Sequence, residues 1–277
     1  MSAVLLTALG AGIVAAALSA VLGYFVVLRG TAFAGHAVTD IGLTGGSGAL
    51  LLHVTSLWGV LAFAAGAAVG IDALGTRARE RDVATGVVLA LALGVGALFL
   101  HIGTNGGNGP TSLLFGSVFA LDPATLGLVA AIGAVSLGAT LALFRPLLFA
   151  SVAPESAALA GVPVRAVGLA FLLAMAIAVG VTSQIVGVLV STALLIGPAA
   201  SAGALVRRPL ATLGLAVSIG ALETTLGIAL AYASYAWPPG GKGWPVSFFV
   251  STLALVGYLV ARAAGDRRDS GAGRARA

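Results

Sequence analysis

The chain has 277 residues, of which 59% are hydrophobic and only 8% are charged, with a mean hydropathy of +1.10. Because a soluble domain carries about 25% charged residues, this composition excludes a water-facing globule and predicts an all-α, polytopic membrane protein. Cysteine is absent, which excludes disulfides and thiolate metal sites.

Apolar segments of a length that crosses a bilayer follow one another along the chain. We expect eight or nine transmembrane helices, with spans near 3–28, 33–52, 57–75, 83–102, 122–144, 164–182, 185–206, 210–236 and 246–263. No positive region precedes the first segment, so it is interpreted as a span and not as a signal peptide. The spans form one transmembrane domain over 1–263, and 264–277 is expected to be a disordered cytoplasmic tail.

The basic residues alternate along this pattern. Loops on one side, with the C-terminal tail, hold every arginine: Arg29, Arg77, Arg79, Arg81, Arg145, Arg165, Arg207, Arg208, Arg262, Arg267, Arg268, Arg274 and Arg276. The other side holds only Lys242. The positive-inside rule therefore predicts a cytoplasmic C-terminus and an external N-terminus. The formal charge of +5 thus reflects topology and does not indicate nucleic-acid binding.

Two boundaries are weak. A single crossing over 164–206 would put Arg207 and Arg208 outside, so we expect a tight outer turn near Ser183 and Gln184. The apolar stretch at 112–120 is too short to span, and a re-entrant segment stays open there.

The motif "GHAVTD", residues 35–40, places a histidine and an aspartate inside the second span. His36 and Asp40 are four residues apart, so they share a helix face, near the middle of the span. A private hydrogen bond that locks helix packing is one interpretation. The other is a metal pathway, because imidazole nitrogen and carboxylate oxygen suit Zn²⁺ or Mn²⁺. Two ligands suit transit, and a dimer partner would supply two more.

Three further side chains are candidates for a role in a metal pathway or at its entrance. Glu223 lies inside the eighth expected span and indicates either a pathway role or bonding between helices through Thr224 or Thr225. His53 and His101 fall at the outer ends of the second and fourth spans. They are interpreted as interfacial histidines or as weak metal ligands at the mouth of a pathway.

The inner loop at 154–161 predicts a short helix. Pro154 suits the first turn of this helix, and the negative charge of Glu155 is favourable near the positive N-terminal end of the helix dipole. Gly161 marks the C-terminal end of the helix. On these grounds alone it is an ordinary connecting helix.

Several blocks of sequence resemble one family in order. "YFVVLRGTAFAGHAVTDIGLTGG" (24–46), together with 81–100, 113–121, 154–165 and 183–202, is similar to the permeases of ABC importers for first-row metals. The resemblance covers about residues 20–262. It implies a homodimeric subunit, in the plasma or inner membrane, of a zinc, manganese or iron uptake system. A cytoplasmic ATPase and an extracellular or periplasmic metal-binding protein would be its partners, with no permanently bound cofactor.

The resemblance also implies residue roles. The family's metal-ligand pair reads Asp, three residues, then His, whereas this chain has the reverse order, His36 then Asp40. The family docks the segment at 154–161 into the ATPase, which assigns coupling to Pro154, Glu155, Leu159 and Gly161. Ala153 replaces the family's usual Asp, a lost helix cap that costs about 1 kcal/mol.

Other classes of protein stay open. A P-loop needs GxxxxGK[ST], and the only lysine, Lys242, has no Ser or Thr after it, so any ATP hydrolysis belongs to a separate chain. An ion-coupled secondary transporter would use Asp40 and Glu223. An intramembrane serine protease would use "GGSG" at 45–48. An ABC importer of bulky chelates is disfavoured by the His–Asp pair.

Overall fold

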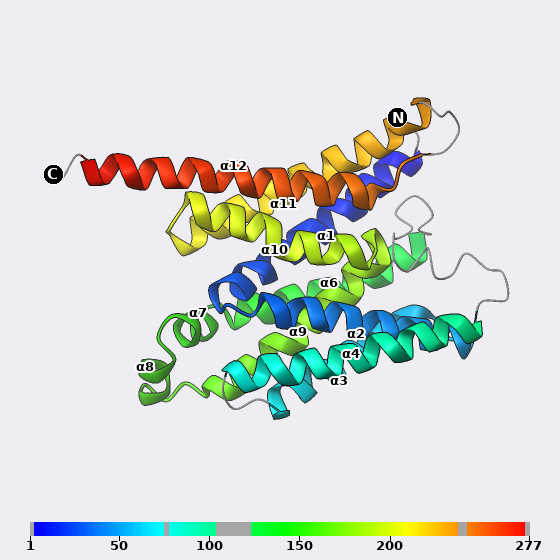
Figure 1. The fold of residues 1–277 in the computed structure, drawn as a ribbon, viewed down its shortest axis with the longest axis horizontal. Coiled ribbons are helices and arrows are strands. Elements are labelled where there is room, and N and C mark those ends of the chain that lie inside the picture. The colour runs from blue at the N-terminus through cyan, green and yellow to red at the C-terminus, as the bar shows by residue number, and fades with distance from the viewer. Residues whose placement is uncertain (1–2, 75–77, 104–122, 238–242, 275–277) are drawn as a thin grey trace.

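The computed structural model describes residues 3–74, 78–103, 123–237 and 243–274, and these residues form helices and no strand. The helices are α1 (Ala3–Leu28), α2 (Ala32–Leu51), α3 (Ser56–Leu74), α4 (Ala78–Gly103), α6 (Pro123–Ala142), α7 (Phe144–Val152), α8 (Pro154–Leu159), α9 (Val164–Val186), α10 (Val188–Leu205), α11 (Pro209–Ala233), the 3-10 turn η1 (Ser234–Ala236) and α12 (Val246–Arg274). The long helices run roughly side by side, and α1 begins at the opposite end of the bundle from the end of α12 (Figure 1).

Eight of the described helices are long and apolar enough to cross a membrane: α1, α3, α4, α6, α9, α10, α11 and α12. The helix α2 is not among them because glycine, threonine, His36 and Asp40 lower its hydropathy. Its 20 residues still extend about 30 Å, the thickness of the hydrocarbon core. It packs against α3, α4, α9 and α10, so neighbouring helices cover much of its surface.

Several boundaries differ from the sequence-based expectation. The break between the sixth and seventh spans lies at Gly187 and not near Ser183 and Gln184. Gly187 has a φ of 86°, a left-handed conformation that favours glycine, whereas Ser183 bonds back to Gly180 and continues the helix. The helix α7 was not expected as a separate element. The expected re-entrant stretch at 112–120 lies outside the described residues.

The C-terminal segment also differs. The helix α12 continues to Arg274, beyond the expected end of the last span at 263. The helix α4 begins at Ala78, and its membrane-spanning segment runs from Val83 to Ile102, as expected.

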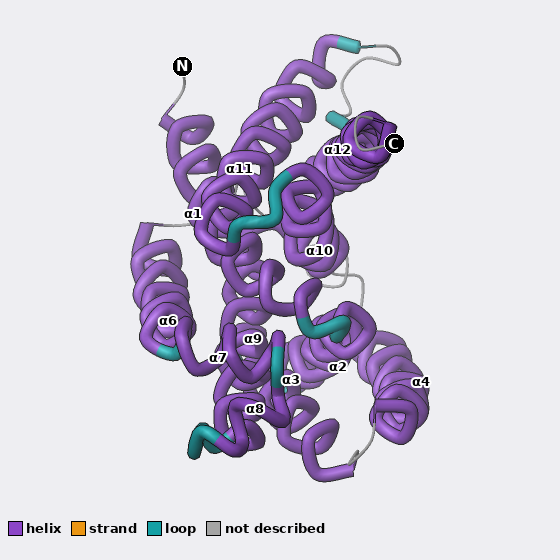
Figure 2. Tube along the Cα trace, turned by 90° about the vertical axis from the view of Figure 1, so that its left-hand side faces the viewer, coloured by secondary structure: helices purple, strands orange, loops and turns teal. Residues whose placement is uncertain are grey.

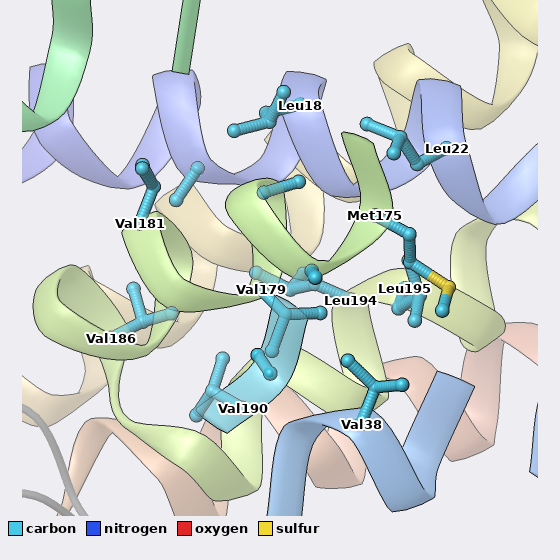
Figure 3. Packing of buried hydrophobic residues seen from close by; sticks show 14 of the residues in the cluster. Leu18, Leu22, Val38, Met175, Val179, Val181, Val186, Val190, Leu194 and Leu195 are labelled. Atoms are coloured by element: carbon cyan, nitrogen blue, oxygen red, sulfur yellow. The ribbon is translucent and has the colours of Figure 1, made fainter. Parts of the chain in front are cut away.

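The buried core lies where α1, α2, α9 and α10 meet. Leu18 and Leu22 of α1, Met175 of α9, Leu195 of α10 and Val38 of α2 all belong to it (Figure 3). The helices α4 and α6 lie at opposite sides of the bundle (Figure 2). Only 11% of the α4 span and 22% of the α6 span are buried, against 72% of α1. The outer helices therefore present apolar surface, and the candidate polar groups of α2 lie near the core.

Small residues bring α2 and its neighbours into close contact. A β-carbon at Gly59 of α3 would overlap the carbonyl oxygen of Gly45 of α2, and one at Gly45 would overlap the carbonyl of Gly59. In the same way, a β-carbon at Gly23 of α1 would overlap the carbonyl of Leu195 of α10. Membrane helices associate through such contacts because no hydrophobic force drives them together in lipid.

We predict that Gly59→Val separates α2 from α3 and lowers the free energy of unfolding by about 1–3 kcal/mol, the usual cost of overpacking. Thermal unfolding of the purified protein in detergent measures this loss. Gly66→Val, on the same helix, is the matched control because a β-carbon there meets no atom within 4 Å. Equal melting temperatures for the two variants would contradict the packing assignment.

Candidate functional site

His36 and Asp40 form an ion-pair contact on one face of α2. His36 is the fifth residue of the helix and Asp40 the ninth, so the pair lies nearer the helix start than the expected middle. His36 Nε2 is 3.4 Å from Asp40 Oδ2, as their spacing of four residues predicts.

A third polar group completes the environment of the imidazole. His36 Nδ1 lies 3.5 Å from Oγ1 of Thr192, the fifth residue of α10. Both ring nitrogens therefore face a polar atom, one on its own helix and one on a neighbour. Sequence analysis did not single out Thr192. The only signal was the polar pair Ser191 and Thr192 inside an otherwise apolar span.

The two members of the pair differ in exposure. The side chain of His36 is 46% exposed on the surface of the single chain, whereas that of Asp40 is 18% exposed. No group of three or more His, Asp or Glu side chains that could hold a metal ion occurs within the described residues. The arrangement therefore offers one nitrogen and one carboxylate group to a cation, which suits brief contact and not tight storage.

Hydrogen bonds and close packing fix the orientation of α2. The Thr44 hydroxyl donates to the carbonyl of Ala92 in α4 at 2.7 Å. A β-carbon at Gly35 would lie 3.2 Å from the Leu195 side chain of α10. The helices α4 and α10 therefore contact α2 at Thr44 and Gly35, on either side of His36 and Asp40 in the sequence. These contacts fix the rotation of α2 about its axis and so the direction of its polar face.

Glu223 lies elsewhere. It is buried in α11, and a β-carbon at Gly257 of α12 would lie 2.8 Å from Glu223 Oε1, so the carboxyl group faces α12. The alternative of bonding through the neighbouring threonines is not observed. The Thr225 hydroxyl donates to the carbonyl of Ala221, and the Thr224 methyl group faces Gly12 of α1.

The two remaining histidines lie at helix ends, as expected. His101 is exposed in the last turn of α4. His53 is exposed just after α2, with a φ of 56°. Its N–H bonds to the carbonyl of Leu50, and the next N–H, of Val54, bonds to that of Ala49. These two bonds are a Schellman motif, in which glycine usually takes the left-handed position.

The helix α8 has the expected form. Pro154 is in its first turn, Ala153 provides no side-chain cap, and Gly161 follows its end with a φ of 83°. The side chain of Leu159 is 91% exposed, so this six-residue helix presents a large apolar side chain at the protein surface. The helix lies at the same end of the bundle as the end of α12 (Figure 1).

The protease alternative has no support in the geometry. The Ser47 hydroxyl is buried and donates to the carbonyl of Thr44 at 2.8 Å, inside its own helix. The surrounding glycines act in packing instead. Gly45 contacts α3, and a β-carbon at Gly48 would meet the ring of Phe99 of α4 at 2.9 Å.

A bundle of helices long and apolar enough to cross a membrane, packed around a more polar helix, defines a multi-pass membrane protein. The family model described as the ABC 3 transport family matches residues 1–260, so the chain belongs to this family.

Known relatives align over most of their length. The chain is 27% identical to the manganese import system permease protein ScaB of Streptococcus parasanguinis, over 83% of this chain and 80% of ScaB. It is also 27% identical to the high-affinity zinc uptake system membrane protein ZnuB of Haemophilus influenzae, over 92% and 98%. The solved structure of PsaBC from Streptococcus pneumoniae in complex with Fab has the same fold, with a TM-score of 0.81 at 23% identity, over 94% of this chain and 91% of that chain.

The Schellman motif generates a prediction for His53. We expect His53→Gly to raise the free energy of unfolding by up to about 1 kcal/mol, because glycine adopts the left-handed conformation without steric cost. Thermal unfolding measures this gain, with His101→Gly as the control inside a helix. A fall in metal uptake by His53→Gly at unchanged stability would instead assign His53 to the pathway.

Proposed function

We propose that the chain is the permease subunit of an ATP-driven importer of a first-row divalent metal ion, manganese or zinc. The observation that carries the proposal is the His36–Asp40 pair on a shielded membrane helix, in a chain of the ABC 3 transport family. A nitrogen and a carboxylate suit these ions. The names of the relatives ScaB and ZnuB, a manganese permease and a zinc uptake protein, support the same two metals.

The pathway in this proposal lies between two copies of the chain. His36 is half exposed on the single chain, so a second copy facing it would bring two imidazoles and two carboxylates to one conduit. Four ligands of this kind match the coordination number of zinc, and the pathway would remain open above and below them. The reversed order of His and Asp keeps both ligands on one helix face.

The remaining assignments concern partners and orientation. The exposed Leu159 and the acidic Glu155 of α8 would dock an ATPase subunit on the cytoplasmic side, together with Pro154 and Gly161, which set the ends of the segment. A metal-binding protein would deliver the ion to the opposite side of a plasma or inner membrane. The C-terminus would be cytoplasmic, as the positions of the arginines indicate.

An ion-coupled secondary transporter is the weaker candidate. It would need Asp40 and Glu223 to cooperate, whereas Asp40 pairs with His36 on α2 and Glu223 faces α12. Membership of the ABC 3 transport family also favours ATP as the source of energy.

We predict that His36→Ala and Asp40→Ala each reduce metal uptake at least about tenfold, the effect of losing one member of a metal-ligand set. Uptake of radioactive Mn²⁺ and Zn²⁺ by proteoliposomes that contain the complete transporter measures this. The variant His36→Asp/Asp40→His, which has the family's order, should keep part of the activity because both ligand types remain on the same face.

The control for this experiment is Phe33→Ala, which truncates an exposed side chain near the start of the same helix. Thermal unfolding separates transport from packing. If the two alanine variants lose stability while transporting at the normal rate per folded molecule, the pair is a structural hydrogen bond and the pathway lies elsewhere.

A second prediction concerns α8. Glu155→Ala together with Leu159→Ala should weaken docking and uncouple ATP hydrolysis from uptake, because the truncated leucine is the largest exposed apolar group of the helix. The ratio of metal transported to ATP hydrolysed is the measurement. Leu210→Ala truncates another exposed leucine, at the start of α11, and serves as control. Normal coupling in the double variant would remove α8 from the docking surface.

A further inference from the structure

Glu223 lies beside an apolar groove that the proposed pathway does not use. The groove has a volume of about 400 Å³ and runs between α11 and α12, with the end of α10 at its edge. Leu205, Leu226, Leu253 and Val260 contribute to its lining, and Glu223 is its one ionisable side chain. An apolar groove of this size with one polar group has the character of a small-molecule site.

The carboxyl group of Glu223 has no partner within the described part of the chain. The residue is only 6% exposed, and neither carboxyl oxygen, Oε1 or Oε2, has a hydrogen-bond partner among the described residues. An ionised carboxylate at this depth costs several kcal/mol unless it is paired. The apolar surroundings therefore favour the neutral acid, whose O–H has no acceptor among the described residues.

Gly257 makes the space that the acid occupies. A β-carbon at this position would lie 2.8 Å from Glu223 Oε1, which is too close for an ordinary contact. The carboxyl group consequently lies against the backbone of α12 at the base of the groove. Any larger residue at 257 would push the acid out of this position.

The rim of the groove faces outward from the bundle. Leu222 of α11 is 59% exposed, and Val256 and Val260 of α12 are 50% and 63% exposed. Because these helices cross the membrane, their exposed apolar side chains face the hydrocarbon region of the bilayer. A molecule dissolved in the lipid can therefore enter the groove from the side.

We propose that Glu223 and this groove form a membrane-depth binding site for apolar molecules that carry one basic nitrogen. The apolar body fills the groove, and the nitrogen accepts the hydrogen bond or the proton of the carboxylic acid. Proton transfer leaves an ammonium paired with a carboxylate, which compensates both charges in the low dielectric surroundings. This site is independent of the His36–Asp40 pathway.

A lipid-soluble carbodiimide tests the acid directly. The reagent reacts with a protonated carboxyl group, and its own basic nitrogen accepts the carboxyl proton. The carboxyl proton moves to one carbodiimide nitrogen, and the carboxylate oxygen adds to the central carbon to form an O-acylisourea. Rearrangement to the stable N-acylurea then marks the residue without any further reactant. Dicyclohexylcarbodiimide is the probe, and peptide mass spectrometry of the protein in lipid nanodiscs locates the adduct.

We expect dicyclohexylcarbodiimide to label Glu223 and a water-soluble carbodiimide to label the exposed Asp266 but not Glu223. Dodecylamine should protect Glu223 from labelling, whereas dodecanol of the same chain length should not. Glu223→Gln should lose the adduct, and Gly257→Ala should slow its formation because the acid no longer fits at the base of the groove. Elution as a single species in size-exclusion chromatography verifies that each variant is folded.

Three outcomes would overturn the proposal. The first is labelling of Glu223 by the water-soluble reagent, which would show an acid open to water. The second is equal protection by dodecanol, which would show that the nitrogen is not recognised. The third is efficient disulfide formation between two copies of a Val256→Cys chain with no labelling of Glu223, which would show that a second copy covers this face. Because the readout is a covalent mark, failure here leaves the transport experiments unaffected.

Discussion

The structure depends on enclosing one polar helix within a membrane bundle. The helix α2 carries His36 and Asp40, and an unshielded charged group at this depth is strongly unfavourable. Shielding requires neighbouring backbones to approach closely, and glycine makes that approach sterically feasible. The contact between Gly45 and Gly59 joins α2 to α3, and the absence of a side chain at Gly23 lets α1 approach α10. The glycines at these positions have their physical reason in these contacts.

The bundle accommodates its two intramembrane acids in different ways. Asp40 keeps a nitrogen partner within 3.4 Å and retains some exposure, so it stays available to a cation. Glu223 has apolar surroundings and no hydrogen-bond partner among the described residues, which disfavours its ionised form. The two acids therefore differ in their surroundings as well as in their burial, because only Asp40 has a nitrogen nearby.

Much of the fold could be predicted from the sequence because membrane helices follow simple rules of length and charge. The first span, 3–28, and the ion pair between positions 36 and 40 needed only hydropathy and helical periodicity. The break between the sixth and seventh spans was predicted from the arginine pattern, but its position at Gly187 was not, because apolar residues continue on both sides and only the backbone conformation reveals the turn. Thr192 was missed for another reason: its contact with His36 spans 156 positions, and no local pattern encodes which helix faces which.

The environment of Glu223 also lay beyond sequence reasoning. An isolated acid in an apolar span predicts an unusual group but not its direction. The neighbouring threonines suggested a partner, yet Thr225 bonds to its own helix and Thr224 faces α1. The decisive feature is Gly257, which is 34 positions away and looks like any other glycine of the chain.

The single-residue junction at Gly187 fixes the rotational phase of α10. Each residue of an α-helix turns the chain by about 100°, so the direction in which every side chain of α10 points is counted from this glycine. With no loop to absorb an insertion, one extra residue would turn Thr192 away from His36 and Leu195 away from Gly23 together. The contact between Thr192 and His36 and the contact between Leu195 and Gly23 therefore both depend on the length of this junction. An insertion or deletion at Gly187 would disrupt both contacts at once.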